Sequence, residues 1–144
     1  MKVLLVSSIG GHLAELLELA PALGEAERVW VLNDTSPVLP AGARAYVIAH
    51  AERDWRVLWN VAELAAIFAR ERPDVVLSMG AGPAVPAALV ARAGGVPFLY
   101  IEPSSAVRVP TLTGRLMRWL TPHRWAQWPE LAQKIRARYV GGIL

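Results

Sequence analysis

The 144-residue sequence contains no cysteine, which excludes disulfide bonds, zinc–thiolate centres and a cysteine nucleophile. It also has no apolar run long enough to cross a bilayer, because the longest uncharged stretch, residues 75–91, contains two glycines and two prolines. Neither the G-x-G-x-x-G fingerprint of dinucleotide-binding proteins nor a P-loop occurs, so NAD and ATP are not supported. No two aspartates stand at D-x-D spacing. We therefore expect neither a cofactor nor a metal ion.

The composition is typical of a folded globular protein. Apolar residues make up 54% of the chain and charged residues 19%, and the length suits one domain spanning residues 1–144. The apolar residues that follow Met1 are too few for a signal peptide and lead directly into a turn, which predicts a cytoplasmic protein.

Basic side chains are concentrated near the carboxyl end of the sequence. Residues 1–102 carry a net charge of −3, whereas residues 103–144 carry +6, interleaved with three tryptophans. Such a segment suits phosphate groups on nucleic acid, an anionic lipid or a sugar diphosphate, although a solvated arginine-rich surface explains most of these arginines individually. Because the first 102 residues are acidic, we do not expect a nucleic-acid partner.

Alternating strand and helix patterns predict an α/β fold. Apolar runs predict strands at residues 2–7, 28–32, 44–48, 74–78, 97–101, 125–127 and 139–140. Helical spacing is found at residues 12–21, 54–70, 84–92, 111–120 and from 129 onward, with Asp54 as one cap and Thr111 or Thr113 as another. Strands that are apolar throughout indicate a Rossmann-like parallel sheet with helices on both faces.

The carboxyl ends of parallel strands meet at one edge of a sheet, and ligands bind there. Three segments follow strand ends in this sequence, namely residues 8–12, 80–83 and 102–105. We therefore expect these segments to converge on one crevice, although they are far apart along the chain.

His12 is the strongest single candidate for chemistry. It follows Gly10 and Gly11, whose backbone amides can approach an anion at the start of a helix. An imidazole in this place can accept a proton from a hydroxyl at neutral pH, or it can simply fix the loop with one hydrogen bond.

Gly80 and Gly82 repeat this arrangement after the fourth predicted strand, either for ligand contact or for a tight turn required by packing. Glu102 stands at the end of the fifth strand. Its carboxylate could bind a sugar hydroxyl, assist His12, or pair with Arg108. Glu15, in the first turns of the first helix, is explained by a favourable interaction with the helix dipole.

Two apolar stripes allow either core packing or contact with a membrane surface. One includes Leu116 and Trp119 on a helix that also carries arginines, and the other includes Trp55 and Trp59 at i, i+4 spacing. We take these four side chains as candidates for the membrane-facing surface.

The ordered set of motifs resembles the membrane-side subunit of the split UDP-N-acetylglucosamine transferase, which adds the second sugar to a dolichol-diphosphate carrier, and related bacterial exopolysaccharide glycosyltransferase subunits. The resemblance covers essentially the whole chain. The matching segments are Ser8-Ile9-Gly10-Gly11-His12 with Glu15, Arg53 and Arg56, Pro73-Asp74-Val75-Val76-Leu77 with Gly80-Ala81-Gly82, Tyr100-Ile101-Glu102, Arg108-Val109 with Thr111-Leu112-Thr113-Gly114-Arg115, Gln127-Trp128-Pro129-Glu130-Leu131, and Tyr139-Val140-Gly141.

The resemblance implies the N-terminal half of a GT-B glycosyltransferase, which binds a polyprenyl-diphosphate-linked sugar acceptor while a separate subunit binds the UDP-sugar. His12 and the amides of Gly10 and Gly11 would lie by the acceptor diphosphate or hydroxyl, and Glu102 matches the family glutamate. His12 and Glu102 are therefore the catalytic candidates. The alternative is a non-catalytic scaffold that recruits the catalytic partner to the membrane.

The same resemblance makes Arg108, Thr113 and Arg115 candidates for diphosphate contact. Three departures from the family pattern stand out. Eukaryotic members carry an N-terminal transmembrane anchor, whereas here Met1 begins the first strand, which implies peripheral association with the cytoplasmic face of the membrane. Pro103 replaces the serine that follows the glutamate, and residues 122–124 lack the aspartate found ahead of the Q-W-P segment.

Overall fold

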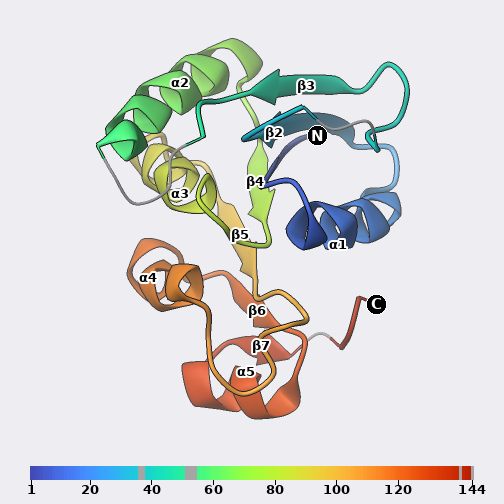
Figure 1. The fold of residues 1–144 in the computed structure, drawn as a ribbon, viewed down its shortest axis with the longest axis vertical. Coiled ribbons are helices and arrows are strands. Elements are labelled where there is room, and N and C mark those ends of the chain that lie inside the picture. Colours follow the sequence, from blue (N-terminus) through green and yellow to red (C-terminus); the bar gives the residue numbers. More distant parts are fainter. Residues whose placement is uncertain (36–37, 51–54, 140, 144) are drawn as a thin grey trace.

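Seven parallel strands form one sheet in the computed structural model of the chain, which describes residues 1–35, 38–50, 55–139 and 141–143 (Figure 1). The strand order is β3-β2-β1-β4-β5-β6-β7, and every neighbouring pair is parallel. The strands are β1 (Lys2–Ser7), β2 (Glu27–Leu32), β3 (Arg44–Val47), β4 (Val75–Ser78), β5 (Phe98–Ile101), β6 (Arg124–Ala126) and β7 (Arg138–Tyr139).

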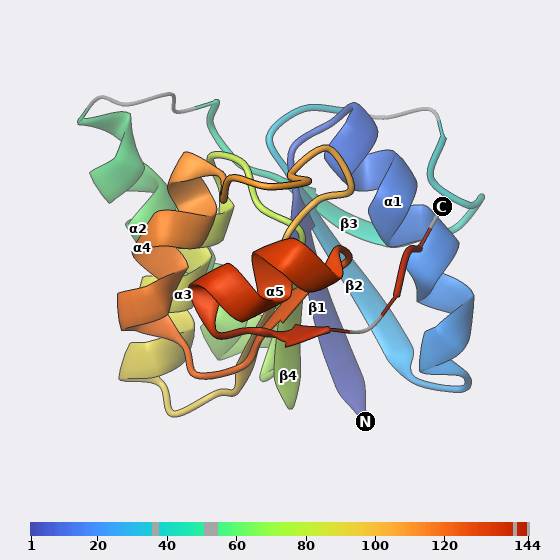
Figure 2. The same cartoon turned by 90° about the horizontal axis from the view of Figure 1, so that it is seen from below.

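Helices cover both faces of this sheet, as Figure 2 shows from below. One face packs against α1 (Gly11–Leu19), which continues into a 3-10 turn (Ala20–Leu23). The opposite face packs against α2 (Arg56–Glu71), α3 (Ala84–Ala93) and α4 (Leu112–Leu120). Strand alternation places Ala126, which contacts α5 (Pro129–Ile135), on this second face as well.

The predicted α/β architecture is therefore confirmed, and the element boundaries agree within a few residues. Strand β1 has its five residues from Val3 to Ser7 buried, as expected for a strand covered on both faces. The helix start that the sequence left open is settled, because the Thr111 side chain accepts a hydrogen bond from the Gly114 amide and caps α4. The predicted cap Asp54 lies outside the described residues.

A buried carboxylate ties the amino edge of the sheet together. Glu71, at the end of α2, accepts hydrogen bonds from Lys2 (3.2 Å) and from the Tyr46 hydroxyl, and forms an ion pair with Arg44 (2.7 Å). Burial by itself raises the pKa of Glu71, but the bonds from Tyr46 and Lys2 and the charge of Arg44 outweigh burial and hold the pKa below its ordinary value. This cluster fixes α2 and β3 against β1.

Candidate functional site

Three turns meet at the carboxyl edge of the sheet, as the sequence predicts. The residue that shows this best is Gly80, which follows β4. The position that a Cβ atom would take on Gly80 lies 3.4 Å from the Tyr100 hydroxyl and 3.8 Å from Cε1 of His12. The turns after β1 and β4 and the end of β5 therefore share one small space.

Glycine is required by the backbone at two points in this space. Gly10 has φ 101° and Gly80 has φ 111°, in a region that residues with a Cβ rarely adopt. At Gly80 a side chain would also crowd Tyr100 and His12. The first turn of α1 begins at Gly11, and the N–H groups of a first turn lack intrahelical acceptors.

The imidazole of His12 is half-buried. Its Nδ1 atom is buried and has no hydrogen-bond partner in the described part of the chain. Hydrogen bonds link the turn that carries His12 to the segments that follow β2 and β3. The Ile9 amide donates to Asn33 Oδ1 (3.1 Å), and the Asn33 side-chain amide bonds to His50 Nδ1 (2.8 Å). His50 is itself exposed, and nothing in the local sequence indicates that it supports this turn.

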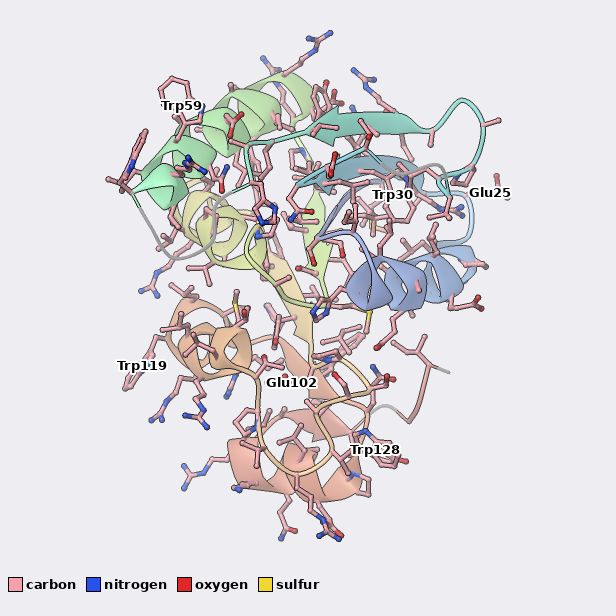
Figure 3. The ribbon with its side chains drawn as sticks, viewed as in Figure 1. Glu25, Trp30, Trp59, Glu102, Trp119 and Trp128 are labelled. Carbon is pink, nitrogen blue, oxygen red and sulfur yellow. The ribbon has the colours of Figure 1, made fainter. Side chains whose placement is uncertain are left out.

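Glu102 lies in the interior, with no exposed surface (Figure 3). Its Oε2 atom accepts from the Thr111 amide (3.3 Å), the Thr111 hydroxyl (3.1 Å) and the Tyr100 hydroxyl (3.3 Å). Its Oε1 atom has no partner among the described residues. The suggested pairing with Arg108 is wrong, because Arg108 instead forms an exposed ion pair with Glu130 (3.3 Å).

Burial raises the pKa of Glu102, and the hydrogen bonds from Thr111 and Tyr100 oppose this only in part. Burial also raises the pKa of the Tyr100 phenol, and the neighbouring Glu102 adds to the increase. A carboxyl group without exposed surface does not reach a ligand directly. The Glu102 carboxylate is joined to the shared space by Tyr100, whose hydroxyl bonds to Glu102 and lies 3.4 Å from the position that a Cβ atom would take on Gly80.

The raised pKa of Glu102 predicts a pH-dependent contribution to stability. This contribution is fully present below the ordinary pKa of 4.5 and is lost as the pH rises through the higher pKa of the folded state. Each unit of increase corresponds to about 1.4 kcal/mol. We expect the difference in free energy of unfolding, wild type minus Glu102→Gln, to fall as the pH rises from 4 to 8 in urea titrations. A constant or rising difference would contradict this assignment.

A second group of side chains, which sequence reasoning missed, holds the loop after β5. Glu15 is buried, and its carboxylate accepts from the Ser104 amide (3.0 and 3.1 Å), the Ser104 hydroxyl (2.8 Å) and the Gln127 side chain (2.7 Å). The Trp128 indole N–H donates to the Ser104 carbonyl (2.7 Å). The helix dipole is therefore not a sufficient explanation for Glu15. The Q-W-P motif is visible in the sequence, but its partners Glu15 and Ser104 are not.

The other residues proposed to contact a diphosphate do not gather as closely as His12 and Gly80 do. Arg108 and Arg115 are exposed and Thr113 is half-buried, and Arg108 is paired with Glu130 and not with a residue of the His12 turn. Gly11 and Gly82 are exposed on the turns that frame the edge. The structure thus brings together the two glycine turns and His12, with Glu102 behind them, and leaves the arginines at the surface.

The two apolar stripes are largely exposed, so packing against the core is the wrong interpretation for their large side chains. Trp55 is 73% exposed, Trp59 60%, Leu116 43% and Trp119 68%. Trp59 and Trp119 project outward on the same side of the molecule (Figure 3), which is the side of α2, α3 and α4. The Arg118 guanidinium stacks 4.5 Å from the centre of the Trp119 ring.

Two further features concern the ranges that the structure covers. None of the helices there is both long enough and apolar enough to span a membrane. No group of three or more histidine, aspartate or glutamate side chains there could hold a metal ion.

Comparison with curated proteins confirms the resemblance that the motifs indicate. The UDP-N-acetylglucosamine transferase subunit ALG14 of Homo sapiens is 24% identical over 180 aligned residues, which include the whole chain and 83% of the human protein. The same subunit of Rattus norvegicus is 25% identical over 178 residues, covering 99% of this chain and 82% of the rat protein. No protein-family model matches the chain.

Solved structures confirm the fold of the N-terminal Rossmann-like domain of GT-B proteins. MurG from Acinetobacter baumannii superimposes with a TM-score of 0.74 at 18% identity, over 90% of this chain and 43% of MurG. The UDP-GlcNAc 2-epimerase from Methanocaldococcus jannaschii superimposes with a TM-score of 0.73 at 15% identity, over 94% of this chain and 42% of the epimerase. The chain therefore spans less than half the length of these neighbours.

Proposed function

We propose that this chain is the acceptor-binding subunit of a two-component glycosyltransferase, which transfers N-acetylglucosamine or a related hexose from a UDP-sugar to a polyprenyl-diphosphate-linked sugar. The observation that carries the proposal is the meeting of His12 with the Gly80 turn at the carboxyl edge of a GT-B-like sheet. Similarity over the whole chain to ALG14, a UDP-N-acetylglucosamine transferase subunit, supports the reaction class.

The donor half comes from a separate protein in this proposal. The fold matches about two fifths of MurG, so a GT-B enzyme needs a second domain of comparable size. Ligand sites commonly lie between domains, and the carboxyl edge of this sheet would form one wall of such a cleft. The partner binds the UDP-sugar, and this chain binds the acceptor.

The chemistry is attack of an acceptor hydroxyl on the anomeric carbon of the donor sugar, with inversion. A new bond forms between the hydroxyl oxygen and the anomeric carbon, the bond from that carbon to the UDP oxygen breaks, and UDP leaves with the electron pair. His12 accepts the hydroxyl proton or orients the hydroxyl. Glu102 supports the site from behind, through Tyr100 and Thr111.

The acceptor diphosphate is bound at the turns that frame His12. Backbone amides at Gly10 and Gly11, at the start of α1, suit phosphate oxygens. The backbone of the turn with Gly80 and Gly82 can approach the same phosphate from a second side. Arg108, Thr113 and Arg115 contribute from the segment that follows β5, where basic side chains predominate. Positive charge in this segment favours a diphosphate on electrostatic grounds.

A transfer assay with the co-expressed donor subunit tests this function. We expect the pair to transfer radiolabelled sugar from the UDP-sugar to a polyprenyl-diphosphate acceptor, and the isolated chain to show neither transfer nor tight UDP-sugar binding by calorimetry. Saturable, tight UDP-sugar binding by the isolated chain would refute this division of roles. If His12 and Glu102 variants co-purify with the partner and retain full transfer, the chain is a recruiting scaffold instead.

Peripheral membrane contact through α2 and α4 is part of the same proposal. The surface consists of Trp55, Trp59, Leu116 and Trp119, with Arg118 beside them, and tryptophan with arginine is the combination found at lipid headgroup level. We expect the Trp59→Ser, Trp119→Ser double variant to lose about tenfold or more in binding to phosphatidylglycerol-containing vesicles. The control is Val47→Ser, which alters an exposed apolar side chain on the opposite face of the sheet. If the double variant and the control bind the vesicles equally in a flotation assay, these side chains are not the membrane-facing surface.

A further inference from the structure

The side chain of Gln127 lies where three distant segments meet. It follows β6 and is almost completely buried, at 3% exposure. Its Nε2 group donates to Glu15 Oε2 on α1 (2.7 Å) and to the backbone carbonyl of Glu102 after β5 (3.1 Å). Its Oε1 atom accepts from the backbone amide of Ile143 (2.8 Å). The NH₂ group and the oxygen of this side-chain amide are therefore both hydrogen-bonded, and they bond to different parts of the chain.

Three contacts together fix which way the Gln127 side chain points, and the Ile143 amide is the one on its oxygen side. In the observed orientation, one donor group faces two acceptors and one acceptor faces a donor. A rotation that exchanges Oε1 and Nε2 would place an oxygen against the Glu15 carboxylate and set two donors against each other. In a buried site each such mismatch is costly. The Ile143 amide therefore anchors the side chain whose Nε2 group bonds to Glu15.

Glu15 transmits this arrangement to the candidate site. It stands three residues after His12 on α1, so the two side chains belong to the same turn of helix. Its buried carboxylate has no ion-pair partner within the described ranges and depends on donors from Ser104 and Gln127. Gln127 thus bonds to the helix turn that carries His12, through Glu15, and to the backbone at the start of the loop after β5.

We propose that Gln127 is a positioning residue of the glycosyltransferase site, through which the segment at residues 141–143 sets the relative position of the His12 turn and the Ser104 loop. Gln127 touches no substrate. It acts through Glu15 and the Glu102 carbonyl on two of the three turns that frame the site. This inference rests on the function proposed above, but the coupling itself does not depend on it.

The decisive comparison is between Ile143→Pro and Ile143→Ala. Both substitutions remove the isoleucine side chain, but only proline also removes the N–H group that bonds to Gln127. Gln127→Ala removes the coupling at its centre. For each protein we would measure hydrogen exchange of the Ser104 amide and the His12 ring resonances by NMR in the isolated chain, and kcat and KM for the UDP-sugar in the pair with its donor subunit.

We expect Ile143→Pro and Gln127→Ala to accelerate Ser104 exchange about tenfold, to shift the His12 resonances, and to lower kcat about tenfold with KM for the UDP-sugar unchanged. Ile143→Ala keeps the N–H group and loses only side-chain packing against the α1 face, so it should stay much closer to wild type than Ile143→Pro in all of these. If Gln127→Ala does not fold, the Ile143 pair decides the matter. Identical behaviour of Ile143→Pro and Ile143→Ala in the NMR measurements overturns the coupling. If the NMR differences appear but the wild-type pair transfers no sugar, the coupling stands and the proposed function fails.

Discussion

His12→Ala is expected to abolish sugar transfer by the reconstituted pair while the chain stays folded. Removing a group that accepts a proton or orients a hydroxyl in the transition state costs about 100-fold or more in rate. The imidazole makes no hydrogen bond to another described residue through its buried Nδ1 atom, so little stability depends on it. The measurement is kcat for transfer, with circular dichroism and thermal unfolding to establish that the fold is intact.

His123→Ala is the matched control for this experiment. His123 is exposed and precedes β6, so it lies at the amino edge of the sheet, away from the three turns. Its replacement should leave both transfer and stability close to those of wild type. Unaltered turnover in His12→Ala would remove His12 from the mechanism, and equal losses in both variants would point to a general effect of histidine removal.

Gly114→Ala is expected to lower the free energy of unfolding by about 3 kcal/mol, toward the upper end of the range for overpacked cores. A Cβ atom on Gly114 would lie 1.5 Å from Oε1 of Glu102 and 2.5 Å from its carboxyl carbon. Glu102 is fully buried and tied to Thr111 and Tyr100, so it has no free space to enter. Helix α4 or the end of β5 must move instead, and we expect transfer activity to fall with it.

The carboxyl group can be identified as the cause by removing it. In a double-mutant cycle, Glu102→Ala frees the space that the Gly114→Ala methyl group needs, so the double variant should be more stable than the sum of the single losses predicts. Gly94→Ala is the control, because its Cβ would meet nothing closer than 3.4 Å and its φ of −85° suits any residue. Additive losses in the cycle would contradict the clash.

Much of the fold could be predicted because its strands are nearly continuous apolar runs. Strand β1 and strand β4 are buried on both faces, which leaves a pattern in the sequence that does not depend on distant residues. Proline and glycine mark the ends of α2 and α3, so their boundaries follow from local chemistry. The parallel sheet then follows from the alternation of these elements.

The supporting side chains of the site could not be predicted in the same way. Glu15 and Gln127 are 112 residues apart in the chain, and Glu15 and Ser104 are 89 apart. An interaction of this kind depends on the register of several strands and produces no recognisable spacing of residues in the sequence. Nothing in the sequence around Tyr100 indicates that its hydroxyl lies beside the Gly80 turn.

Helical periodicity identified the apolar stripes but not the side that is buried. On α4 the small residue Gly114 and Met117 face the core, while Leu116 and Trp119 are exposed. Gly114 can lie against Glu102 because it has no side chain, and a hydropathy pattern gives such a position little weight. The correct face therefore needs three-dimensional information.

The exposed tryptophans occupy a lateral side of the sheet, whereas the glycine turns occupy its carboxyl edge. If the lateral side rests on lipid, the mouth of the site opens along the bilayer surface and not toward the bulk solution. An acceptor anchored by its hydrocarbon tail would then arrive by diffusion within two dimensions, with its headgroup already at the right height. Encounter would depend on how densely the acceptor populates the leaflet, and little on its negligible concentration in water.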